Sequence, residues 1–375
     1  MQNQSLLNRI DWILFLAILP ILGAGLITMH SFTGDATYAS HQMIWIAASM
    51  VVFFGLATLD VRFLRSTWVS VALFAISVAL LGALMVLGRI SHGAQSWFSF
   101  GAFSFQPSDF AKIALIIVLA KYFSRRHIEI ADFKHIVISG LYTFVLFVLV
   151  LLHPDFGSAL IIFLVWLGMI MVSGISKKHL FAMIGIVAIS FGLLWSFGFK
   201  EYQKQRIVNF INPLADIHGA GYNAYQSTIA VGSGELFGKG VGYGTQSRLR
   251  FLPEYQTDFI FAAFAEEWGF VGIVILFGLY GVIIWRIISI ASRGATNFEI
   301  LYGAGVAVFF IVHIAVNVGM NMHLLPVTGT PLPFMSYGGT HIMSEFIALG
   351  LLMAMSAYAR PAHKDADRNE FIGPQ

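Results

Sequence analysis

The chain contains no cysteine, so it can form neither disulfide bonds nor thiolate metal sites. Charged residues are also scarce: they make up 11% of the sequence, whereas about a quarter is usual in soluble proteins. The 12 histidines show no HExxH or related spacing, which argues against a dedicated zinc site. A net charge of +3, with the basic residues in short loops, gives no support to nucleic-acid binding.

Apolar residues are abundant instead. Hydrophobic residues account for 58% of the chain and the mean hydropathy is +0.78, which indicates an integral membrane protein. The apolar runs are long and continuous rather than alternating, so we predict an all-α polytopic fold with about ten transmembrane helices. The first run should be retained as a membrane anchor because it has no small-residue cleavage site. The expected spans are centred on Leu16–Met29, Ile44–Ala57, Val69–Leu87, Phe110–Tyr122, Ile136–Leu152, Ala159–Val172, Leu180–Phe197, Phe259–Trp285, Tyr302–Met322 and Ile342–Ala359.

The connectors between these spans are alternately basic and not basic. By the positive-inside rule the basic side is cytoplasmic, which places both termini in the cytoplasm. The other side then receives a large extracytoplasmic loop at residues 198–257, between the seventh and eighth helices. We therefore predict one transmembrane domain over residues 1–362 and a cytoplasmic tail at 363–375. The basic residues that set this orientation are Arg62, Arg65, Arg125, Arg126, Lys177, Lys178, Arg286, Arg293, Arg360 and Lys364.

Asp258 stands where the large loop passes into an apolar run that also contains Glu266 and Glu267. Carboxylates in membrane-compatible sequence are costly, which points to function. The residues alone support two roles for Asp258 equally well: a helix N-cap, or a general base at the outer membrane boundary. We interpret Glu266 and Glu267 as structural support inside the bundle.

Several cationic residues are candidates for binding an anion. In QPSDFAK, Asp109 precedes Lys112 by three residues, so the two can pair at a helix start; alternatively, Lys112 projects into a cavity and holds a phosphate. The large loop adds Arg206, Lys239 and Arg248, beside alternating glycines that could present backbone N–H groups to a diphosphate. Between the last two spans, LPVTGTPLPFMSYGGT predicts either a re-entrant turn that lines a cavity or an ordinary outer loop.

Five motifs occur together along the chain, in the order HPDFGSA, YQSTIAVGSGELFGKG, GTQSRLRFLPEYQTDFIFAAFAEEWG, NVGM and TGTPLPFMSYGG. In this combination the chain resembles the SEDS family (shape, elongation, division and sporulation proteins) of bacterial cell-wall synthesis, over nearly its whole length. The EYQKQRI and GAGYNAYQS stretches are closer to the elongation members than to the division members. The resemblance implies a peptidoglycan glycosyltransferase that polymerises lipid II at the outer face of the cytoplasmic membrane.

The resemblance also implies residue roles. The family's essential acid falls on Asp258, which would be the general base. Two positions depart from the family's pattern: Asp109 stands where glutamate is usual, which shortens its reach, and Ser96 stands where a basic residue often precedes the tryptophan. The substrate-binding candidates are Lys112, Asp109, Arg206, Lys239, Arg248 and Ser336, and the supporting candidates are Glu266, Glu267, Trp97, Asp155 and Asn317.

The implied reaction joins the 4-hydroxyl of an acceptor GlcNAc to C1 of a donor MurNAc, with inversion and release of undecaprenyl diphosphate. We expect Lys112, Arg206, Lys239 and Arg248 to contact the diphosphate. No cofactor is certain, and a divalent cation, Mg²⁺ or Mn²⁺, is a candidate without assigned ligands. The expected partners are lipid II, undecaprenyl diphosphate, the lipid bilayer and a class B penicillin-binding protein as transpeptidase. The alternatives are a flippase or transporter of the lipid-linked precursor, a non-catalytic scaffold for the transpeptidase, and a division-type polymerase.

Overall fold

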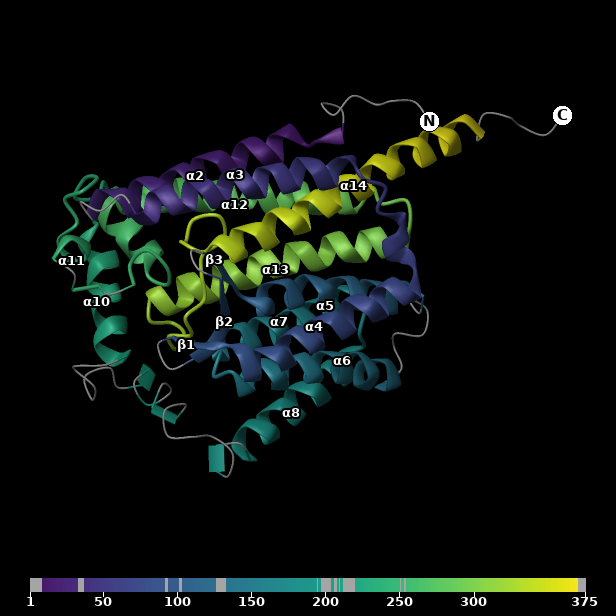
Figure 1. The fold of residues 1–375 in the computed structure, drawn as a ribbon, viewed down its shortest axis with the longest axis horizontal. Helices are drawn as coiled ribbons and strands as arrows, with labels where there is room; N and C mark the ends of the chain where they lie inside the picture. The colour runs from purple at the N-terminus through teal and green to yellow at the C-terminus, as the bar shows by residue number, and fades with distance from the viewer. Residues whose placement is uncertain are drawn as a thin grey trace.

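A computed structural model describes residues 9–32, 37–91, 94–100, 103–125, 133–193, 195–196, 204–205, 208, 210–211, 220–249, 251–252 and 254–369. In this part of the chain, long helices form an elongated bundle with a small sheet at its side (Figure 1). The elements are α2 (Trp12–Phe32), α3 (Thr37–Thr58), η1 (Arg62–Arg65), α4 (Thr67–Leu87), β1 (Arg89–Ser91), β2 (Ala94–Phe100), β3 (Phe103–Phe105), α5 (Pro107–Ser124), α6 (Phe133–Leu152), α7 (Phe156–Val172), α8 (Lys177–Leu193), α10 (Ala220–Ser233), α11 (Thr245–Arg248), α12 (Ile260–Ala291), α13 (Asn297–Asn321) and α14 (Gly339–Asn369).

Nine of the ten predicted spans fall on helices over nearly their whole length, and the seventh, Leu180–Phe197, falls on α8 as far as Leu193, which confirms the polytopic helical membrane fold. Among the described residues, seven helices are long and apolar enough to cross a membrane on their own, namely α2, α3, α4, α6, α12, α13 and α14. The outer surface of the bundle is apolar: Trp68 is 83% exposed and Val86 is 81% exposed on α4. Exposed side chains of this kind are expected where lipid rather than water surrounds the helices.

The helix α13 lies in the middle of the bundle and contacts α5, α7, α12 and α14. On one side of it, α2, α3, α12 and α14 pack together, and on the other side lie α4, α5, α6 and α7 (Figure 1). Because α13 touches both groups, polar side chains that face inward from it can reach both halves. The central helix therefore positions groups at the meeting point of the two halves.

A three-stranded antiparallel sheet precedes α5 and was not predicted. Its strands lie in the order β1–β2–β3, and Phe98 pairs with Phe105 while Phe100 pairs with Phe103. The rings of Phe98 and Phe105 stack at 6.5 Å, and Phe105 stacks on Phe110 of α5 at 5.0 Å. The alternation FSF–GA–FSF is a hairpin signal that hydropathy alone overlooks, so the all-α prediction holds for the membrane helices only.

The large predicted loop also contains helices, α10 and α11, joined by a glycine-rich turn at residues 234–244. This turn docks against α12 where Gly269, with φ of +65°, interrupts the helix. Lys239 N and Gly240 N donate to the carbonyls of Glu266 and Glu267 at 2.9 and 3.0 Å, and Phe270 N donates to the Glu235 carbonyl at 2.9 Å. The turn therefore satisfies backbone groups that the interruption releases, as any buried backbone at membrane depth requires.

Several basic residues gather at one end of the bundle. The start of α2 and the last turns of α14 lie at one end, whereas α10 and α11 lie at the other (Figure 1). At the first end, Arg65 pairs with Glu299, and Arg286 Nε donates to Asp11 Oδ1 at 3.1 Å. The basic residues Arg62 and Arg293 are exposed near the same helix ends. This distribution is the one that the positive-inside rule assigned to a single side.

Candidate active site

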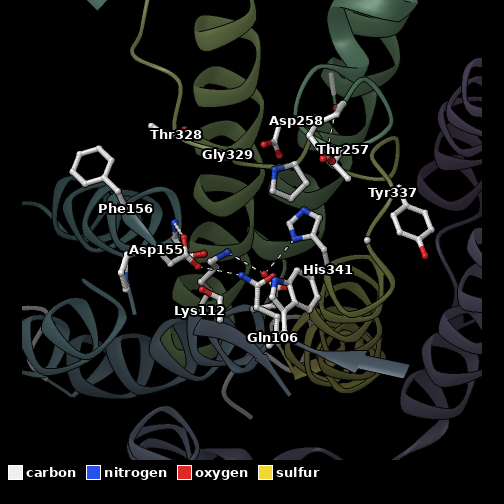
Figure 2. A pocket seen from close by; sticks show the side chains of 18 residues that line it. Gln106, Lys112, Asp155, Phe156, Thr257, Asp258, Thr328, Gly329, Tyr337 and His341 are labelled. Carbon is white, nitrogen blue, oxygen red and sulfur yellow. Dashed lines mark hydrogen bonds and ion pairs between the residues drawn. The ribbon is translucent and has the colours of Figure 1, made fainter. Parts of the chain in front are cut away.

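A cavity of about 360 Å³ lies at the end of the bundle where α5, α7, α12 and α14 begin. The residues that line it are Ser96, Trp97, Gln106, Asp109, Lys112, Pro154, Asp155, Phe156, Ser158, Glu254, Thr257, Asp258, Thr328, Gly329, Pro331, Tyr337, Gly338 and His341. Figure 2 shows these side chains, which come from segments far apart in the sequence. The irregular segment between α13 and α14 forms part of the cavity wall, so it is a cavity-lining turn, one of its two predicted forms.

Asp258 lies in the turn that leads into α12. The N–H groups of Thr257 and Phe259 donate to the Glu254 carbonyl at 3.1 and 3.3 Å, which closes this turn. Phe259 occupies the N-cap position of α12, one residue after Asp258. On a facing segment Gly329 has φ of +72°, and a Cβ there would lie 3.4 Å from Asp258 Oδ2. Glycine thus permits the left-handed conformation that brings this segment against the carboxylate.

Two buried asparagines of α13 hold the backbone of Asp258. Asn317 Nδ2 donates to the Asp258 carbonyl at 3.1 Å and to the Thr330 carbonyl at 2.7 Å. Asn321 Nδ2 donates to the same Asp258 carbonyl at 3.0 Å, and both asparagines are fully buried. The central helix therefore ties the Asp258 turn to the segment before α14.

Asp109 and Lys112 form a buried pair at the start of α5. Lys112 Nζ lies 3.0 Å from Asp109 Oδ1, and each side chain is only 2% exposed. Thr340 Oγ1 donates to Asp109 Oδ2 at 3.2 Å. Both residues of the pair also line the cavity, so the ion pair and the cavity contact, which the sequence offered as alternatives, occur together.

His341 and Glu345, on α14, were missed by the sequence analysis. His341 lines the cavity, and its Nδ1 lies 3.5 Å from Asp109 Oδ1 while its Nε2 lies 2.9 Å from Glu345 Oε1. Glu345 is completely buried and accepts a hydrogen bond from Phe334 N at 3.0 Å. The available signal was a pair of ionisable residues four positions apart in an apolar helix, which is costly unless it has a role.

Asp155, the N-cap of α7, lines the cavity at the starts of α5 and α7. Its Oδ1 accepts from Ser158 N at 2.9 Å and its Oδ2 accepts from Gln106 Nε2 at 3.1 Å, so it joins the starts of α5 and α7. Trp97 of β2 forms part of the same wall. Asp155 and Trp97, which we predicted as supporting residues, therefore both line the cavity.

Tyr337 stands in the segment just before α14 and is half-buried. Its ring contacts that of Tyr38 edge-on at 5.1 Å. Burial, with a contribution from Tyr38, raises the pKa of the Tyr337 hydroxyl above its ordinary value. The hydroxyl therefore stays protonated at neutral pH and can donate a hydrogen bond within the cavity.

Glu266 and Glu267 point away from the cavity and hold the glycine-rich turn. Glu266 Oε1 accepts from Lys239 Nζ at 2.8 Å and from Gln246 N at 3.1 Å. Glu267 Oε1 accepts from Gly242 N at 2.7 Å and from the Ser31 hydroxyl at 2.6 Å. Both carboxylates are buried, and their donors make them structural anchors of the large loop.

The remaining predicted substrate contacts lie elsewhere. Lys239 binds Glu266, and Arg248 is exposed on α11; neither lines the cavity. Arg206 lies outside the described residues. Ser336 is buried behind the wall, where its hydroxyl donates to the Thr257 carbonyl at 2.6 Å and accepts from Leu332 N at 2.8 Å. It thereby fixes the turn that carries Asp258.

No group of three or more His, Asp or Glu side chains suited to a metal ion occurs among the described residues. The cavity holds the carboxylate of Asp258, the Lys112 ammonium and several hydrogen-bond donors, and it is bounded by helices with lipid-facing surfaces. These features define a polytopic membrane protein with a cavity at one end that charged side chains line.

The chain belongs to the FtsW/RodA/SpoVE family: residues 4–361 match the family's sequence model, which is described as "Cell cycle protein". It is 36% identical to the peptidoglycan glycosyltransferase MrdB of Escherichia coli K12, over 95% of this chain and 96% of that protein. It is 36% identical to stage V sporulation protein E of Bacillus subtilis, over 93% of this chain and 98% of that protein.

Solved structures agree with this assignment. A chain from a structure titled "Structural coordination of polymerization and crosslinking by a peptidoglycan synthase complex" matches with a TM-score of 0.79 and 28% identity, covering 93% of this chain and 98% of that chain. The rod shape determining protein RodA of Thermus thermophilus matches with a TM-score of 0.70 and 28% identity, covering 92% of this chain and 96% of that chain.

Proposed function

We propose that this protein is a peptidoglycan glycosyltransferase that polymerises lipid II into β-1,4 glycan strands during cell elongation. Relatives that align over nearly the whole chain carry that activity in their names. The observation that carries the proposal is the cavity itself, because it places the carboxylate of Asp258 in one chamber with the buried Lys112–Asp109 pair.

Asp258 serves as the general base. It takes the proton from the 4-hydroxyl of the acceptor GlcNAc as that oxygen forms a bond to C1 of the donor MurNAc. The bond from C1 to the diphosphate oxygen breaks, and undecaprenyl diphosphate leaves with the electron pair. A single base suffices because a diphosphate is already a good leaving group, in contrast to the sugar hydroxyl released by glycoside hydrolases.

The departing diphosphate needs positive charge nearby, and the cavity supplies it from Lys112. The first turns of α5, α7 and α14 also meet at this cavity, and N-terminal helix ends favour anions. Asp155 and Gln106 shape the wall between two of these ends. A divalent cation, Mg²⁺ or Mn²⁺, would add further positive charge beside the diphosphate.

The proposed setting is the bacterial cytoplasmic membrane, with both termini in the cytoplasm and the cavity at the outer face. The arginines paired with Asp11 and Glu299 support a cytoplasmic position for their end of the bundle, by the positive-inside rule. Lipid II then reaches Asp258 with its sugars outside the bilayer and its polyprenyl chain within it. The proposed partner is a class B penicillin-binding protein that cross-links the new strands.

The test uses the purified protein with its transpeptidase partner, labelled lipid II and a separation of glycan strands by length. We expect strands from the wild type and from Asp60→Asn, a control at an exposed ion pair, but none from Asp258→Asn. A wild type that transfers lipid II across vesicle membranes without making strands would instead indicate a flippase. Strands formed by Asp258→Asn would exclude Asp258 as the base.

A further inference from the structure

The buried pair of Asp109 and Lys112 continues into a second pair that the reaction scheme above does not use. His341 lies between the two carboxylates, with Nδ1 3.5 Å from Asp109 Oδ1 and Nε2 2.9 Å from Glu345 Oε1. Lys112 Nζ and His341 Nδ1 both approach Asp109 Oδ1, and Figure 2 labels Lys112 and His341 among the side chains that line the cavity. All four side chains are at most 4% exposed, so water screens their charges little.

With both carboxylates ionised, the charges of this cluster balance only if the imidazole is protonated. With neutral His341, the carboxylates of Asp109 and Glu345 face a single ammonium, and the cluster has an uncompensated buried negative charge. With protonated His341, two cations face two anions. The other ionisable groups near the ring are His313 of α13, whose ring centroid lies 4.9 Å away, and Asp258 and Tyr337, which line the same cavity.

We propose that His341 is a positioning residue: its cationic imidazole keeps the buried cluster neutral against Asp109 and Glu345, so that the Lys112 ammonium can attract the diphosphate of a lipid-linked substrate. This inference rests on the proposed function. His341 also lines the cavity, but both of its ring nitrogens lie near carboxylates, so we assign its effect to the charge of the cluster. Without the charge on His341, the cluster carries a net negative charge and repels a diphosphate.

The experiment measures the dissociation constant of undecaprenyl diphosphate for four purified proteins: wild type, His341→Gln, Glu345→Gln and the double variant. We expect His341→Gln to weaken binding on the order of tenfold, the effect of one unit charge roughly 10 Å away at an effective dielectric constant of about 20. Glu345→Gln removes a negative charge and should bind as tightly as the wild type or more tightly. The double variant restores charge balance and should return close to the wild-type constant.

A purely structural role for His341 gives a different pattern, because each single variant would then weaken binding and the double variant would be worse than either. That pattern, or unchanged binding in His341→Gln, overturns the proposal. The control is His135→Gln, a buried histidine of α6 that contacts the Tyr122 hydroxyl and does not line the cavity. Its binding should equal that of the wild type.

If His341→Gln does not fold, Glu345→Gln alone decides, since weaker binding by that variant contradicts the charge argument. Strand formation from lipid II is measured on the same preparations. If the four proteins bind with the expected pattern but the wild type makes no strands, the proposed function is refuted and this inference is not. Wild type that makes strands while the pattern is absent refutes only the inference.

Discussion

Replacing Asn317 by alanine tests whether the central helix α13 positions the catalytic carboxylate. The substitution removes the donor to the Thr330 carbonyl and one of two asparagine donors to the Asp258 carbonyl. Asn321 still serves Asp258, but the Thr330 carbonyl loses the donor that the structure gives it. One buried acceptor left without its partner costs about 1–3 kcal/mol, so the melting temperature should fall.

The effect on turnover should exceed the effect on substrate affinity. Asn317 joins the Asp258 turn to the segment that carries Gly329, so its loss lets the carboxylate shift relative to the substrate. A displacement of about 1 Å can lower the rate roughly 100-fold. The assay is the initial rate of strand formation over a range of lipid II concentrations, which separates kcat from KM.

The matched control is Tyr302→Phe, on the same helix about 22 Å away by helical rise. It also removes a buried hydrogen bond to a carbonyl, from Tyr302 Oη to Ala348 at 3.0 Å. We expect it to lower the melting temperature but to leave kcat unchanged. If Asn317→Ala loses stability to the same degree and keeps its full kcat, the positioning argument is wrong.

Two other substitutions test the parts around the cavity. Gly269→Ala should destabilise the protein strongly, because φ is +65° and the new Cβ would lie 2.2 Å from Gly238 N. The control Gly278→Ala lies in open space on the same helix and should leave the melting temperature unchanged or raise it. Equal melting temperatures for the two variants would contradict the docked turn. Lys112→Ala should raise the KM for lipid II, because Lys112 lines the cavity. Lys239→Ala should lower stability without changing KM, because Lys239 binds Glu266 outside the cavity. A raised KM for Lys239→Ala with an unchanged KM for Lys112→Ala would indicate that the large loop binds the diphosphate.

The membrane helices were predictable because the length and continuity of an apolar run are sufficient to define a span. The Asp109–Lys112 pair was predictable for a similar reason, since helix geometry alone brings residues three apart together. His341 was not, because a lone histidine in an apolar helix can face lipid, core or cavity, and tertiary packing decides which. In the folded protein His341 lies against Asp109, a contact between segments far apart in the sequence.

The glycine-rich turn shows a different limit. Its alternating glycines suggested backbone N–H groups free for a diphosphate, but those of Lys239, Gly240 and Gly242 donate to Glu266 and Glu267. The two carbonyl acceptors are free because α12 is interrupted at Gly269, and hydropathy does not reveal an interruption inside a long apolar run. The same interruption explains why two carboxylates can be buried there: the docked turn supplies their donors.

The most direct test of the central claim is the rate of glycan formation by Asp258→Asn at saturating lipid II. Asparagine has nearly the same size and keeps a hydrogen-bonding oxygen, but it cannot take a proton. Loss of a general base predicts a kcat lower by roughly 10²–10⁴-fold, with little change in KM or melting temperature. A kcat close to that of the wild type would contradict the assignment of Asp258 as the base.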